Sequence, residues 1–252
     1  MTDSRSARVW SLVAAQSARH GGPVSAADVC LAAVAAVEVT GAWLIAARGA
    51  EAGHLMRVTD KASELLAELQ VTLGEGPGPD AAASGGPVLA SDLDETEAVR
   101  RWPAFAPAAR QAGAAAIFAF PLQLGAIRTG VMSLYRVRSG PLSAFQLGDA
   151  LVFADTATML LLDAQDQLAY GAGPAGTGPG GQPADLTRHR AEIDQATGML
   201  TEQLGVGIGE AFVRLRAYAY AHDRRLSDLA RDIVARRLRL SPDPDLREEN
   251  QA

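Results

Sequence analysis

A stretch rich in glycine and proline, AYGAGPAGTGPGGQP at residues 169–183, constrains the fold of this chain more than any other feature. It carries no charged side chain and almost nothing apolar that a core could bury. Such a composition is typical of a linker and not of a helix or strand. The chain is therefore expected to form two folded parts, residues 1–168 and residues 184–240, followed by an acidic tail at residues 241–252.

Composition excludes several classes of protein. We find no apolar run long enough to span a bilayer, and the N-terminus MTDSRSARVW lacks the basic and then apolar order of a signal peptide. We therefore expect a cytoplasmic protein without a membrane partner. The single cysteine, Cys30, excludes an intrachain disulfide and is expected to be a small buried apolar residue. With only four scattered histidines, no metal site is predicted.

Charge is distributed unevenly along the chain. The whole chain has 23 basic and 29 acidic residues, a net charge of −6. Residues 184–240 hold ten arginines against eight acidic residues, a net charge of +2, while residues 1–183 carry −5 and residues 241–252 carry −3. A mildly basic block allows contact with a polyanion, but the excess is far below that of a strongly basic nucleic-acid domain.

Hydrophobic periodicity in the first part predicts helices, several short strands and a hairpin. Ser25 is a suitable N-cap for the second helix. The predicted helices are residues 7–18, 26–39, 61–70, 97–113 (interrupted by Pro103 and Pro107) and 144–167, and the predicted strands lie in 41–50, 53–60, 86–93 and a hairpin in 115–143 that turns at Leu124 and Gly125. Five or six strands, with helices at the two ends and over one face, predict an α+β sandwich.

The segment TLGEGPGPDA, residues 72–81, resembles a loop that cradles phosphate. Such loops need converging backbone N–H groups and, in the best-known version, a lysine after the second glycine. Pro77 and Pro79 have no N–H, and no lysine follows. The glycine and proline spacing therefore favours an irregular turn over a nucleotide site.

The segments LGEGP, GPVLASDL and the hairpin AIFAFPLQLGAIRTGVMSLYR resemble a GAF domain over residues 20–165. This resemblance implies an antiparallel sheet with flanking helices and a sensory role, with residues 72–81 near a ligand pocket. An unidentified small ligand is therefore expected, and no other cofactor is predicted. Cys30 lies too early to match the cysteine that attaches tetrapyrroles in photoreceptor members, so a bilin is not expected.

The second part is expected to be an all-α domain of three short helices. Their apolar faces are formed by Ile193, Ala196, Leu200 and Leu204, by Ala211, Phe212, Leu215, Tyr218 and Ala219, and by Leu226, Leu229, Ala230, Ile233 and Val234. A domain this small buries little apolar area, which favours a homodimer.

The segments QATGML, EAFVRLRAYA and RRLSDLARDIV, in this order, are similar to ANTAR domains. Together the two parts resemble the GAF–ANTAR regulators of transcription antitermination of actinobacteria. The resemblance implies an RNA-binding output domain. Two departures bear on RNA affinity: Thr197 stands where many members have lysine, and Gly207 ahead of Glu210 is a weak helix cap.

Arginine and tyrosine side chains can contact phosphates and stack on unpaired bases. Arg239 also lies off the apolar face of the third helix. The predicted RNA-binding residues are Arg214, Arg216, Tyr220, Arg224, Arg225, Arg231, Arg236 and Arg237. An alternative is that the arginines form a solvated face paired with Asp223, Asp228 and Asp232, with Tyr218 in the core.

Two functional hypotheses follow. The first is a signal-responsive regulator whose dimeric output domain binds RNA hairpin loops and prevents a transcription terminator from forming. The second is a non-catalytic interaction module that docks a protein partner without binding RNA. An enzyme is not expected, because no catalytic constellation rises above chance and the four histidines stand in separate contexts.

Overall fold

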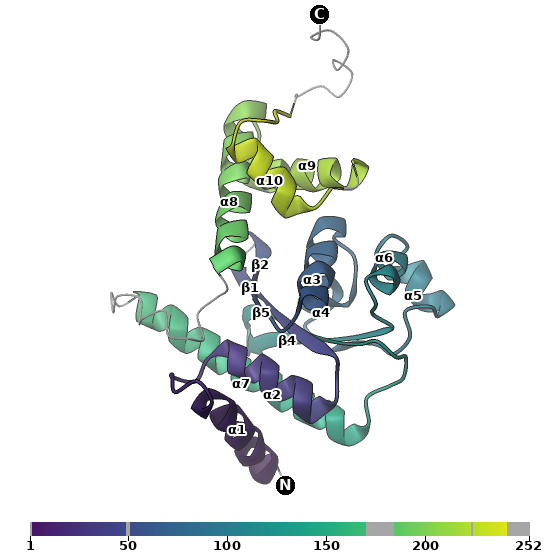
Figure 1. Ribbon diagram of the computed structural model, residues 1–252, viewed down its shortest axis with the longest axis vertical. Helices are drawn as coiled ribbons and strands as arrows, with labels where there is room; N and C mark the ends of the chain where they lie inside the picture. The colour runs from purple at the N-terminus through teal and green to yellow at the C-terminus, as the bar shows by residue number, and fades with distance from the viewer. Residues whose placement is uncertain (1, 49–50, 170–183, 223, 241–252) are drawn as a thin grey trace, which may run out of the picture. The chain divides into compact units, whose positions relative to one another are not determined.

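The computed structural model describes residues 2–48, 51–169, 184–222 and 224–240 (Figure 1). It divides into two compact units, residues 1–183 and residues 184–252, which are described separately below. Of the predicted linker only Ala169 lies within the described residues, at the end of a helix. The predicted acidic tail, 241–252, lies outside them.

The first unit is built on one sheet of five strands in the order β2-β1-β5-β4-β3, in which every neighbouring pair is antiparallel. The strands are β1 (Gly41–Arg48), β2 (Glu51–Val58), β3 (Val88–Ala90), β4 (Ala116–Leu124) and β5 (Ile127–Arg136). Gly125 occupies the β4–β5 turn with φ 60°, close to the predicted position. In β5, a Cβ on Gly130 would lie 2.1 Å from the carbonyl oxygen of Ile45, so this close approach requires glycine.

Two helices, α2 (Ala26–Val37) and α7 (Ala144–Ala169), cover one face of the sheet, and α1 (Thr2–Ala18) packs on both of them. Asp28, three residues after the predicted N-cap Ser25, accepts hydrogen bonds from the Ser25 backbone N–H at 2.9 Å and the Ser25 hydroxyl at 2.7 Å. Cys30 is buried in this layer with a free thiol, as predicted.

Residues 144–164 of α7 are long and apolar enough, by length and composition, to cross a membrane, with a mean hydropathy of 1.3. The sequence-based expectation that no such run exists was therefore wrong. The apolar character has a structural reason: Ala150, Phe153 and Ala157 of this helix lie in the core against β4 and β5. Core helices commonly meet the same length and composition criterion, so the finding is weak evidence for a membrane span.

The opposite face is covered by α3 (Lys61–Leu73) and α4 (Pro77–Ser84), and the short helices α5 (Thr96–Arg101) and α6 (Phe105–Gln111) contribute to the same core. Their core contains the buried aromatic side chains of Trp43, Trp102 and Phe105. The sheet therefore has helices on both faces (Figure 1), and the expectation of helical cover at two ends and over one face was wrong in this respect. The antiparallel sheet with flanking helices is confirmed.

Residues 72–81 form the end of α3, a short turn at residues 74–76 and the start of α4, so the predicted irregular turn is shorter than expected. Gly74 ends α3 in the left-handed conformation, and Pro77 is the first residue of α4, a position that proline suits. The Gly78 N–H donates to Gln70 Oε1 at 2.6 Å, and a Cβ on Gly76 would lie 2.7 Å from that oxygen. The glycines therefore make room for the Gln70 amide.

The second unit consists of α8 (Ala184–Leu204), α9 (Ile208–Ala221) and α10 (Leu226–Val234), as predicted. Among the residues whose burial the structure describes, these helices bury aliphatic side chains and two side chains with hydroxyl groups: Ala196, Thr197, Leu200, Ala211, Leu215, Ala219, Leu226, Ser227, Leu229, Ala230 and Ile233. Gly207 is the N-cap of α9 and makes no side-chain hydrogen bond there, as its lack of a side chain requires.

Candidate functional site

Asp232 on α10 draws two of the predicted RNA-binding residues together. Arg237 donates to Asp232 Oδ1 from Nε at 2.9 Å and from Nη2 at 2.6 Å, and Arg224 donates from Nη2 to Oδ2. The hydrogen bonds from Arg224 and then Arg237 hold the pKa of the Asp232 carboxyl below its usual range. We call Arg224, Asp232 and Arg237 the Asp232 clasp. Because two guanidinium groups share one carboxylate, the clasp keeps a net charge of about +1.

Two further predicted residues are held in ion pairs. Arg231 contacts Asp228 Oδ1 at 3.0 Å and Glu192 Oε2 of α8 at 3.4 Å, and Arg214 contacts Glu210 Oε1 at 2.6 Å on α9. The alternative interpretation of the arginines as a paired face is thus supported for Asp228 and Asp232. Asp223 lies outside the described residues.

Arg216 and the tyrosines of α9 differ in exposure. The Arg216 guanidinium lies 5.9 Å from the Phe212 ring centroid, and burial lowers its pKa. The Tyr220 residue is 63% exposed, so its ring face is accessible for stacking. Tyr218 is half-buried and stacks on His222 with ring centroids 3.9 Å apart.

The remaining predicted arginines lie at the two ends of α10. Arg225 is exposed at the N-cap position. Arg236 is exposed just past the C-terminal end, with φ 57° and its N–H bonded to Ile233 O at 2.9 Å. Arg239, which was not among the predicted site residues, is also exposed. Neither Arg236 nor Arg239 contacts a carboxylate within the part of the chain that the structure describes.

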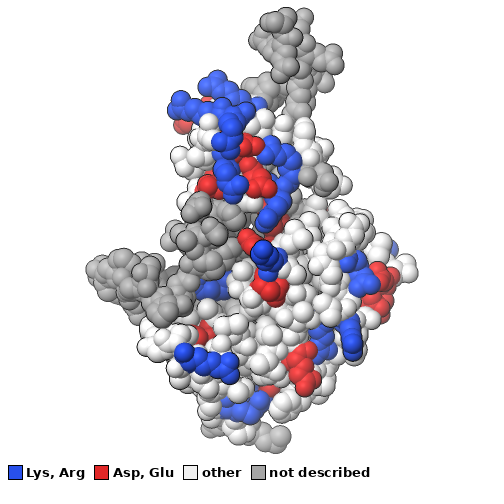
Figure 2. Space-filling view, viewed as in Figure 1, with Lys and Arg blue, Asp and Glu red and all other residues white. Residues whose placement is uncertain are grey.

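Figure 2 shows basic side chains gathered over the C-terminal unit, with acidic side chains between them. The sequence suggested this mixture, since acidic and basic residues nearly balance there. It did not reveal which arginines are paired. A left-handed turn at Arg236 has no signal in the sequence, because glycine is the usual residue at such a helix end.

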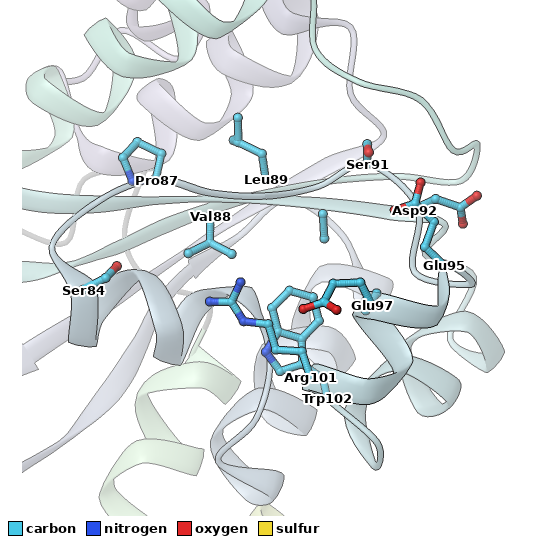
Figure 3. A pocket seen from close by; sticks show the side chains of 12 residues that line it. Ser84, Pro87, Val88, Leu89, Ser91, Asp92, Glu95, Glu97, Arg101 and Trp102 are labelled. Atoms are coloured by element: carbon cyan, nitrogen blue, oxygen red, sulfur yellow. The ribbon is translucent and has the colours of Figure 1, made fainter.

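An open hollow of about 360 Å³ lies in the first unit between β3 and α5 (Figure 3). Val88 points from β3 toward Arg101 and Trp102. Arg101 Nε donates to Asp80 Oδ2 at 2.6 Å, and Trp102 Nε1 donates to the same oxygen at 3.0 Å. The Asp80 carboxylate offsets the charge of Arg101, which weakens the attraction of the hollow for an anion.

The hollow is not lined by residues 72–81, which the resemblance had placed near a pocket. Glu75 of that segment instead accepts the backbone N–H groups of Ala104 and Phe105 at 2.9 and 3.1 Å, at the start of α6. No group of three histidine, cysteine or acidic side chains that could hold a metal occurs among the described residues.

A family model for the ANTAR domain matches residues 186–234. No curated protein matches the chain. Similar solved structures include the GAF domain of a phosphoenolpyruvate-protein phosphotransferase from Coxiella burnetii, with 12% identity, a TM-score of 0.48, and coverage of 65% of this chain and 98% of that one. The corresponding Acinetobacter domain has 11% identity, a TM-score of 0.48, and coverage of 67% and 98%.

The GAF-B domain of DevS from Mycobacterium smegmatis is 19% identical, with a TM-score of 0.42 and coverage of 57% of this chain and 94% of that one. At these scores the likenesses say nothing about a ligand. The fold assignment of the first unit stands on its own five-stranded antiparallel sheet and the helices on its two faces.

Proposed function

We propose that this chain, whose residues 186–234 form an ANTAR domain, is a signal-responsive regulator that binds RNA hairpin loops and acts by transcription antitermination. The family match carries the proposal, because ANTAR domains are RNA-binding output domains. Both expected domain families are regulatory and not enzymatic. The exposed arginines and Tyr220 add side chains that can contact phosphates and unstacked bases.

In this proposal the output domain works as a homodimer. The small cores of α8, α9 and α10 leave apolar surface uncovered, since Val213 on the outward face of α9 is 58% exposed. Pairing of two output domains would cover part of that face. A small ligand or partner of the first unit would then control RNA binding by changing the fraction of paired output domains.

The second candidate is an interaction module that docks a protein partner and binds no RNA. The ion pairs of Arg214, Arg224, Arg231 and Arg237 favour it, since paired arginines are typical of a solvated surface. Docking through an apolar helix face would not depend on arginines beyond the end of α10.

Crosslinking of the full-length protein to cellular RNA, followed by sequencing, separates the two candidates. The test variant is R236E/R237E, and the matched control is R100E, a charge reversal at a 76% exposed side chain of the first unit. We expect wild type and R100E to recover hairpin-forming leader sequences that R236E/R237E loses. Equal recovery by all three proteins would favour the interaction module, and an unchanged helical circular dichroism spectrum must accompany either result.

A further inference from the structure

The segment that follows α10 is fixed at both ends. At its start, the backbone N–H of Arg237 donates to Asp232 O at 2.8 Å, and the Arg237 side chain joins the Asp232 clasp. At its end, Leu240 is only 5% exposed and its carbonyl accepts from Gln203 Nε2 of α8 at 2.7 Å. Residues 236–239, called the arginine loop below, are therefore held against the helices.

The backbone at Arg236 carries a conformational cost. With φ 57° it is in the left-handed region, where the Cβ of any residue other than glycine is crowded by the backbone. Such positions persist where the surrounding structure determines them, and they are frequent at binding sites. The bonds to Asp232 and Gln203 are that surrounding structure here.

The three arginines of this loop are not equivalent. Arg237 is paired with Asp232, whereas Arg236 and Arg239 are exposed and contact no carboxylate among the described residues. The carboxylate partner of a paired arginine offsets its charge, so a paired arginine contributes less to phosphate binding than an unpaired one. An unpaired arginine that contacts a phosphate displaces counterions from the RNA and breaks no ion pair of the protein.

We propose that the arginine loop is the phosphate-contacting element of the RNA site, with Arg236 and Arg239 each contacting a backbone phosphate. The Asp232 clasp holds the loop in position. This inference rests on the proposed RNA-binding function, adds Arg239 to the site, and assigns Arg214 little part in phosphate binding because Glu210 compensates its charge.

The test measures affinity against salt concentration for the full-length protein. The probe is the tightest hairpin that the wild type selects from a pool of RNA hairpins with randomised loops. R239Q is expected to reduce the slope of log K against log salt by about 1 and R236Q/R239Q by about 2. The control R100Q, which neutralises an exposed arginine of the first unit, should keep the wild-type slope. Between 50 and 200 mM salt, the advantage of wild type over R236Q/R239Q should shrink roughly tenfold.

The conservative variant R236K/R239K guards against a folding effect. It keeps both charges and should keep the wild-type slope, because a point charge is enough for a phosphate contact. A wild-type slope in R236Q/R239Q, a reduced slope in R100Q, or a reduced slope in R236K/R239K would each overturn the proposal. If the pool yields no hairpin that the wild type binds, the proposed function fails and this inference with it.

Discussion

Asp232 forms ion pairs with both Arg224 and Arg237. Its ionisation should therefore affect the stability of the second unit and the position of the arginine loop. Its pKa in the folded protein is lowered by Arg224 and Arg237. A lowered carboxyl pKa means that the ion pairs contribute stability above the unfolded-state pKa of about 3.9 and lose it as the pH falls through the folded value.

We therefore expect Asp232 to titrate below about pH 3.9 in carboxyl NMR, and R237Q to move its pKa upward toward the ordinary value. D232N should be less stable than wild type at pH 7, and the difference should vanish in acid. The same Asp232 pKa in wild type and R237Q would show that the clasp does not form in solution.

Cys30 provides a second residue-scale prediction. Cys30 is 1% exposed, and this burial raises the pKa of its thiol to about 12. The charge of Arg57 acts in the opposite direction but is the smaller effect. The thiolate is the reactive form, so native protein should resist iodoacetamide at pH 8, and urea-unfolded protein should react completely. Rapid labelling of the native state would mean that α2 opens readily.

The sequence predicted which kinds of side chain form ion pairs, but not which arginine pairs with which carboxylate. The sequence indicates that Asp228 and Asp232 lie among arginines, and both form ion pairs. It could not separate Arg237 from Arg236, because the difference depends on how the chain leaves α10. The eight predicted RNA-binding residues remain a prediction.

Among the helices and strands, strong periodicity made most segments predictable, and turn chemistry caused the main errors. The density of glycine and proline at residues 72–81 hid α4, although proline is compatible with the first turn of a helix. Amphipathic patterns also do not say which face of a sheet a helix covers. The helices at 61–70 and 97–113 were therefore predicted, but their place on the second face of the sheet was not.

Glu75 links two of these helices, because it follows α3 and caps the start of α6. E75A should lower the free energy of unfolding of the first unit by about 1–2 kcal/mol, the usual cost of losing a helix cap. E75Q keeps an acceptor oxygen and should lose less. Urea unfolding followed by tryptophan fluorescence measures both, and equal stability of E75A and wild type would contradict the capping role.

For the whole molecule, the Gly/Pro-rich segment predicted two parts, and the chain divides into two units. The sequence contains three tryptophans, Trp10, Trp43 and Trp102, all in the first unit. Tryptophan fluorescence therefore reports on that unit alone, whereas far-ultraviolet circular dichroism reports on both.

We expect two unfolding transitions, with the smaller core of the second unit melting first. L200A in α8 should lower the circular dichroism transition of the second unit and leave the fluorescence midpoint unchanged. F118A in β4 should lower the fluorescence midpoint. Each substitution removes a fully buried side chain, at a cost of about 2–5 kcal/mol. A fluorescence midpoint that shifts in L200A would mean that the units unfold together.

The left-handed turn at Arg236 should also produce a trade-off between stability and activity in laboratory evolution. Glycine adopts this conformation without the steric cost that arginine bears, so a screen for heat resistance alone should enrich R236G. The same substitution removes a guanidinium that the proposed RNA site needs. Selection for the proposed antitermination activity should restore arginine at this position, at the expense of thermal tolerance.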